Sequence, residues 1–156
     1  MTSLEKLQQT AADMGLEVLD YHFDSDRIHG LCCDHVIALN SQLPDSIARA
    51  CVLEEEIAHY DLTVGDIIIE SVPANSKQEH KARMLAYTRR VSLELLISSL
   101  RAGYRTASDI AEYMEVTEEF LTAAIEEYRA KYGHYVKVGD DWLMLEPAVG
   151  LVMHVE

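Results

Sequence analysis

The sequence predicts an α+β fold in a single domain, residues 1–156, and three observations support this prediction. Apolar residues recur at helical spacing in several segments. Short apolar runs separated by turn residues fill the segment 17–40, and an alternating pattern surrounds Gly139. Of the 156 residues 49 % are apolar and only 7 are Gly and 3 Pro. The chain therefore has enough apolar surface for a packed core.

The N-terminal part predicts one helix followed by a small sheet. Apolar side chains from Leu4 to Met14 are spaced to lie on one helix face, and Gly15 follows where a C-terminal cap would sit. The segment 17–40 changes to short apolar runs, broken by acidic turn residues and by Gly30. We expect two or three strands of a small antiparallel sheet here.

Two longer helices are predicted in the middle of the chain. The first opens at Pro44 and Asp45 and runs to about Leu62, with one apolar stripe and no internal Gly or Pro. A loop that contains the apolar run 67–69 leads to the second helix, which is predicted from about residue 76 to residue 100. These helices and the sheet would form a core of residues 1–100.

The C-terminal third predicts a helical part, 101–133, and a terminal hairpin, 134–156. Two helices fit residues 106–132, with Thr117 as the N-cap of the second, and their spacing is typical of a helix-turn-helix. The second of these helices is acidic, which argues against DNA reading. Alternation around Gly139 predicts the hairpin, with Trp142 as its anchor.

Charge and cysteine content narrow the classes of partner. The chain has 13 basic and 27 acidic side chains, a net charge of -14, which repels nucleic acid and anionic lipid. We expect no direct nucleic-acid or membrane partner. An odd count of three cysteines, two of them the neighbours Cys32 and Cys33, favours reduced thiols, and no signal peptide or membrane-length apolar run occurs. These features predict a cytoplasmic protein.

The run of three glutamates followed by His59 is the strongest candidate for a metal site in the sequence. Glu55 and His59 stand four apart, so both side chains lie on one helix face and could bind one metal ion, with Glu56 positioned to hold a water. This is the His-Glu-x-x-His geometry with its first histidine replaced. The alternative is a solvated acidic face with a Glu55–His59 pair. Three adjacent residues cover about 200° of helix circumference, so one glutamate must point toward buried neighbours.

A catalytic zinc usually has three protein ligands, and Glu79 on the next helix is the candidate for the third. Ser76-Lys-Gln-Glu79 is also a capping-box pattern, and spacing alone leaves the two roles of Glu79 open. The cluster Cys32-Cys33-Asp-His35 contains ligand residue types, but adjacent cysteines cannot easily share one zinc. We interpret that cluster as a core strand.

Several stretches together resemble one known family. The segment 51–60 resembles the metal helix of the ImmA/IrrE metallopeptidases, with a variant Glu-Glu-x-x-His motif, particularly small members from phages and integrative elements of Gram-positive bacteria. The segment 30–40 resembles the strand and turn before that helix, and 79–87 resembles the third-ligand helix. Residues 110–133 are similar to the C-terminal helical part, so the resemblance covers roughly residues 1–133.

The resemblance implies a zincin-like core, in which the small sheet packs on the metal helix, and a role for individual residues. It implies Glu55, His59 and Glu79 as metal ligands and Glu56 as general base. It also implies an edge strand that pairs with a substrate backbone, formed by Val36, Ile37, Ala38 and Leu39. The implied cofactor is zinc. Glu55 replaces the family's histidine, and the harder carboxylate ligands also suit manganese or iron.

The function implied is cleavage of a specific protein partner, a phage-type helix-turn-helix repressor, so that the chain would act as an anti-repressor. The acidic surface would help to dock a basic DNA-binding protein. The alternative is a non-catalytic binding module of the same fold, which sequesters a repressor or acts as a toxin–antitoxin partner.

Overall fold

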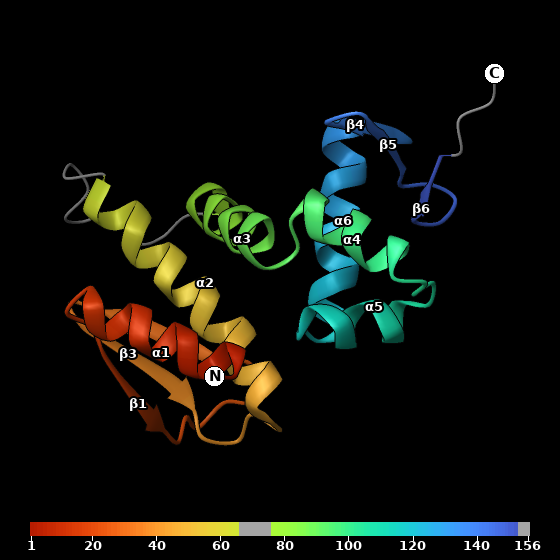
Figure 1. The fold of residues 1–156 in the computed structure, drawn as a ribbon. Helices are drawn as coiled ribbons and strands as arrows, with labels where there is room; N and C mark the ends of the chain where they lie inside the picture. The colour runs from red at the N-terminus through yellow and green to blue at the C-terminus, as the bar shows by residue number, and fades with distance from the viewer. Residues whose placement is uncertain (66–75, 153–156) are drawn as a thin grey trace. The chain divides into compact units, whose positions relative to one another are not determined.

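The computed structural model describes residues 1–65 and 76–152 and has an α+β fold with two small sheets (Figure 1). The chain divides into two compact units, Met1–Ala86 and Tyr87–Glu156. This boundary lies within a helix and not at residue 100, where the sequence placed the end of the core. No helix in the described ranges is long and apolar enough to cross a membrane.

The sheet of the first unit contains β1 (Glu17–Tyr21), β2 (Gly30–Cys33) and β3 (Val36–Asn40) in the order β1-β3-β2. Three strands are present where the sequence predicted two or three, but the sheet is mixed and not antiparallel. β3 pairs with β2 in an antiparallel hairpin and with β1 in a parallel manner. The parallel pair arises because the chain passes from β1 to the far side of β3 before β2 begins, which local sequence patterns do not reveal.

The core of the first unit lies where α1 (Ser3–Asp13) and α2 (Ser46–Gly65) cover one face of this sheet (Figure 1). Both predicted helices are confirmed. Asp45 caps α2, since its Oδ1 accepts a 2.8 Å hydrogen bond from the backbone N–H of Ala48. Period-two alternation turns Ile37 and Leu39 into the core. The buried cluster comprises Leu7, Ala11, Leu16, Ile37, Leu39, Ala50, Leu53 and Ile57.

The helix predicted over 76–100 is two helices, α3 (Ser76–Arg90) and α4 (Leu93–Arg101). The prediction of one continuous helix was wrong because Ser92 starts a new one. Its side chain accepts a 3.1 Å hydrogen bond from the N–H of Leu95, as an N-cap does. The apolar run 67–69 lies outside the described residues. The side chain of Ser76 is also outside them, so the capping-box interpretation of Glu79 stays a prediction.

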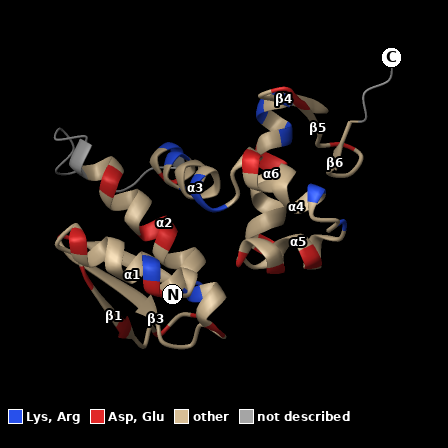
Figure 2. Ribbon diagram, in the orientation of Figure 1, with Lys and Arg blue, Asp and Glu red and all other residues tan. Residues whose placement is uncertain are grey.

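The second unit contains α4, α5 (Ala107–Met114), α6 (Glu118–Tyr132) and a sheet of β4 (Tyr135–Val138), β5 (Asp141–Met144) and β6 (Gly150–Leu151). Thr117 is confirmed as the N-cap of α6, because its hydroxyl accepts a 3.1 Å hydrogen bond from the N–H of Phe120. Acidic residues lie on α5 and at the start of α6 (Figure 2). This unit therefore presents acidic side chains where a DNA reader would present basic ones.

The terminal hairpin is confirmed, but its predicted anchor was wrong. Gly139 adopts a φ of +62° at the turn between β4 and β5. Trp142 is 44 % exposed, whereas its neighbour Leu143 is fully buried. Successive strand residues point to opposite faces, so the register that buries Leu143 places Trp142 outside. A further short strand, β6, pairs with β5 and has no counterpart in the predicted hairpin.

Candidate functional site

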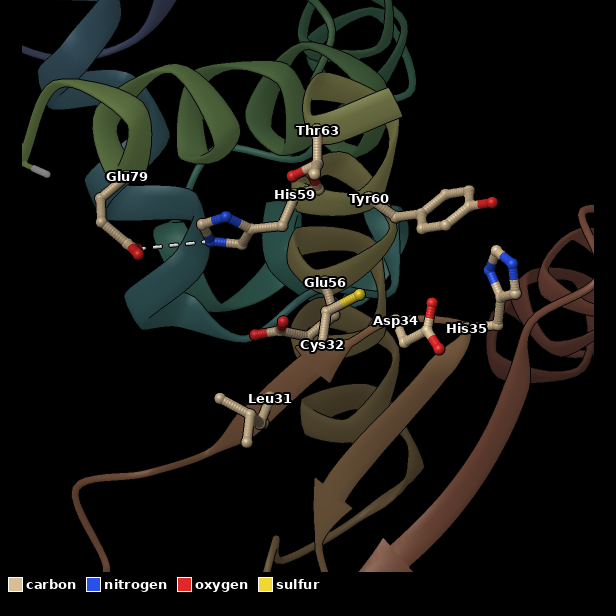
Figure 3. Close-up of a pocket in the computed structure, with 10 residues that line it drawn as sticks. Leu31, Cys32, Asp34, His35, Glu56, His59, Tyr60, Thr63 and Glu79 are labelled. Carbon is tan, nitrogen blue, oxygen red and sulfur yellow. Dashed lines mark hydrogen bonds and ion pairs between the residues drawn. The ribbon is translucent and has the colours of Figure 1, made fainter. Parts of the chain in front are cut away.

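The first unit contains a pocket of about 480 Å³ between β2, the turn that follows it, α2 and the first turn of α3 (Figure 3). The structure brings three of the predicted site residues together here, Glu56, His59 and Glu79. The remaining lining residues are Gly30, Leu31, Cys32, Asp34, His35, Tyr60 and Thr63.

One face of α2 supplies four of the lining residues. Glu56, His59, Tyr60 and Thr63 follow the spacing i, i+3, i+4, i+7, which places their side chains in one stripe along a helix. The Thr63 hydroxyl donates a 2.8 Å hydrogen bond to the backbone carbonyl of His59. The stripe faces the pocket because the apolar residues of α2 are turned into the core.

Glu55 lies beside this stripe and is not one of the lining residues. Its carboxyl group is partly buried and interacts electrostatically with Arg83 and Glu79. The glutamate that is buried against the core is the preceding residue, Glu54. One glutamate of the run therefore points inward, as helix geometry predicts, and the tertiary structure selects Glu54.

One side-chain contact in the pocket joins two helices. His59 Nε2 lies 3.3 Å from Glu79 Oε2, a distance that fits a hydrogen-bonded ion pair if the imidazole is protonated (Figure 3). Glu79 therefore points toward α2, as the predicted role of third ligand requires. The contact also places α3 next to the pocket in the first unit.

The pocket concentrates negative charge. The pKa of Glu56 is raised to about 7, first by burial and then by the neighbouring carboxylates of Glu55 and Glu79. Burial also raises the pKa of Glu55, an effect that Arg83 partly offsets. The pKa of the Cys32 thiol is raised to about 11, first by burial and then by Glu56. A bound cation would relieve this repulsion.

The imidazole of His59 and the carboxylate of Glu79 are ligand types that bind divalent transition metals. In the part of the chain that the structure describes, these two side chains lie together without a third ligand beside them. Imidazole nitrogen and carboxylate oxygen are both zinc ligands. Within residues 1–65 and 76–152, no three His, Cys, Asp or Glu side chains are grouped closely enough to hold a metal ion. The structure thus supplies His59 and Glu79 together, with Glu55 outside the pocket.

The assignment of residues 36–39 as an edge strand was wrong. β3 is the central strand, and its backbone groups pair with β1 on one side and β2 on the other. A substrate backbone cannot add to a strand whose two edges are already paired. The strand at the pocket is β2, which pairs only with β3 in the described part of the chain, and its residue Leu31 is 53 % exposed.

The turn between β2 and β3 contributes Asp34 and His35 to the pocket lining, and neither was predicted as a site residue. Asp34 has a φ of +57°, which reverses the chain and brings His35 close to Tyr60, with ring centroids 6.0 Å apart. Cys32 and His35, interpreted as part of a core strand, line the pocket instead. The spacing from Glu56 would have identified Tyr60 and Thr63.

Comparisons with protein-family models, with curated proteins and with solved structures give no match to this chain.

Proposed function

We propose that the chain is a metal-dependent peptidase that cleaves a specific protein partner in this pocket. The observation that carries the proposal is the meeting of His59 and Glu79 at 3.3 Å, next to Glu56 and to the open strand β2. In the proposal His59 and Glu79 bind the metal, and Glu55, one turn before His59, would turn from its place beside the pocket to become the third ligand. The resemblance of this helix to the ImmA/IrrE metal helix supports the same assignment.

A zinc ion, or manganese or iron, would polarise the scissile carbonyl and lower the pKa of a bound water. Glu56 accepts a proton from the attacking water and passes it to the leaving amine. Its place among the lining residues puts the carboxyl group in the same cavity as His59 and Glu79. In the proposal, α2 therefore supplies the general base Glu56 and the ligand His59 from one face, and α3 supplies the ligand Glu79.

The edge of β2 is the surface on which we propose that the substrate binds. The N–H and C=O groups on this edge, which pair with no other strand among the described residues, would bind an extended peptide as an added strand. Three residues of β2, Gly30, Leu31 and Cys32, line the pocket, so a peptide on this edge passes the groups that act on it. The proposed binding strand is therefore β2 and not residues 36–39.

The proposed substrate is a basic DNA-binding repressor of the helix-turn-helix type, with the chain as its anti-repressor. The net charge of -14 supports a basic partner, because opposite charge accelerates encounter and disfavours acidic competitors. The resemblance to small phage and integrative-element peptidases supports the repressor assignment. The same fold acting as a binding module would sequester that repressor without cleaving it.

The deciding experiment compares wild type with Glu56→Gln, which keeps the shape of the side chain and removes the base. Each is expressed without a tag, and new protein N-termini in the cells are identified by mass spectrometry, with the exposed-site variant Glu126→Gln as control. We expect one partner to be cut by wild type and Glu126→Gln at substoichiometric amounts and left intact by Glu56→Gln. An intact one-to-one complex with all three proteins would instead establish the binding module.

A further inference from the structure

Gly30, the first residue of β2, makes an unusually close approach to α2. A Cβ atom at this position would lie 2.7 Å from Cγ1 of Val52, 3.2 Å from Cγ of Glu56 and 3.3 Å from the carbonyl oxygen of Ala38. All three distances are shorter than ordinary van der Waals contacts, which begin at 3.4 Å. Any other residue would therefore displace a neighbour.

The backbone conformation does not explain the glycine. Four glycines of the described residues have positive φ, and Gly30 is not one of them. A residue with a side chain could adopt this backbone without strain, so the requirement is for space alone.

Two of the three neighbours cannot easily move. The Ala38 oxygen belongs to the backbone of the central strand β3. Val52 is β-branched and in a helix has one strongly preferred rotamer, so its methyl group is held in place. The Glu56 side chain is the neighbour free to rotate, and rotation would carry its carboxyl group away from its present position. Gly30 itself lines the pocket beside Glu56.

We infer that Gly30 is a positioning residue for Glu56: the missing side chain lets the Glu56 methylene lie against β2 and directs the carboxyl group into the pocket. The catalytic consequence rests on the proposed function, whereas the placement of Glu56 does not. Gly30 also leaves the start of the β2 edge without a side chain at the point where the general base meets it. Sequence alone gives no sign of this role.

The test is the variant Gly30→Ala in the full chain, with Val52→Ala/Gly30→Ala to separate positioning from packing. The double variant removes the 2.7 Å contact and keeps the contact with Glu56. Gly150→Ala is the matched control, since a Cβ in that strand meets only the flexible end of Met144 at 3.3 Å. Crystal structures, melting temperatures and zinc affinity are measured for each.

We expect Gly30→Ala to move the Glu56 carboxyl group and to lower the melting temperature. The double variant should recover the melting temperature of wild type, but its Glu56 carboxyl group should stay displaced. All variants should keep the zinc affinity of wild type, because His59 and Glu79 are unchanged. On a cleaved substrate, Gly30→Ala should lower kcat by roughly 10²-fold with KM retained, as expected for a misplaced reacting group.

The inference is overturned if Glu56 keeps its wild-type position in Gly30→Ala, or returns to it in the double variant, because Gly30 would then serve packing with Val52 only. Failure of the proposed function has a different signature. If wild type binds no metal and cleaves nothing, the position of Glu56 in the two variants still decides the role of Gly30.

Discussion

The Nε2 atom of His59 on α2 lies 3.3 Å from the Oε2 atom of Glu79 on α3. Two ligand atoms bound at about 2.0–2.1 Å to a tetrahedral zinc ion are about 3.3 Å apart, so the spacing suits a shared metal. The same spacing suits an ion pair that needs no metal. The two interpretations differ in what happens when one partner is replaced.

Replacing His59 by Ala should abolish metal binding. His59 is the only nitrogen ligand in the proposed set, and two carboxylates without it would hold zinc weakly. Metal content is measured by inductively coupled plasma mass spectrometry on protein purified without a histidine tag. His35→Ala is the control, because His35 lines the same pocket but is not a proposed ligand. Wild type free of transition metal, even after reconstitution, would contradict the metal site and favour the binding module.

Replacing Glu79 by Gln should weaken zinc binding by at least about 100-fold, since loss even of an outer partner of a ligand costs 10–100-fold. In the metal-free protein the same change should alter the free energy of unfolding by less than about 1 kcal/mol, because the His59–Glu79 pair is partly exposed. Competition with a chromogenic chelator gives the affinity, and urea denaturation gives the stability. Large loss of stability with unchanged affinity would mark Glu79 as a purely structural partner.

Replacing Glu56 by Gln should stabilise the metal-free protein at high pH. The folded-state pKa of Glu56 is raised to about 7 from 4.5, so its stabilising contribution is present below pH 4.5 and is lost as pH rises through 7. We expect Glu56→Gln to exceed wild type by roughly 1–3 kcal/mol at pH 8, with the difference vanishing toward pH 4.5. The free energy of unfolding of wild type and of Glu56→Gln is measured by urea denaturation at pH 8 and at pH 4.5, with a chelator present to remove metal.

The control for this titration is Glu126→Gln on the exposed face of α6. Its difference in stability from wild type should be small, because the Glu126 side chain is exposed. A Glu56→Gln variant less stable than wild type at pH 8 would show that the ionised carboxylate is stabilised in the pocket, contrary to the prediction.

Replacing Leu143 by Ala should destabilise the second unit far more than replacing Trp142 by Ala. Leu143 is fully buried, and loss of a buried leucine costs about 2–5 kcal/mol through lost transfer energy and a cavity. Trp142 is 44 % exposed and should cost markedly less, although it is the larger side chain. Thermal denaturation followed by circular dichroism compares the two. Equal losses would show that Trp142 anchors the hairpin after all.

Local signals in the sequence determined the hairpin and the helices other than the one predicted over 76–100, where the N-cap Ser92 was missed. The cap residues Asp45 and Thr117 act through hydrogen bonds three residues along the chain, so the pattern contains both partners. The turn at Gly139 is equally local. For the same reason the sequence predicted that one of three successive glutamates points inward, and that Glu55 and His59 lie on one helix face.

Contacts between distant segments were decided only by the tertiary structure. Which strand is central depends on pairing between β1 and β3, and this moved the open edge from residues 36–39 to β2. Which glutamate faces the pocket depends on what packs against the rest of α2, and this selected Glu56 over Glu55. The space that Gly30 leaves for Glu56 exists only once strand and helix meet. The spacing of residues along the chain determines which side chains are neighbours within one helix or strand. Which of them are buried, and which backbones pack closely, depends on the elements brought together from elsewhere in the chain.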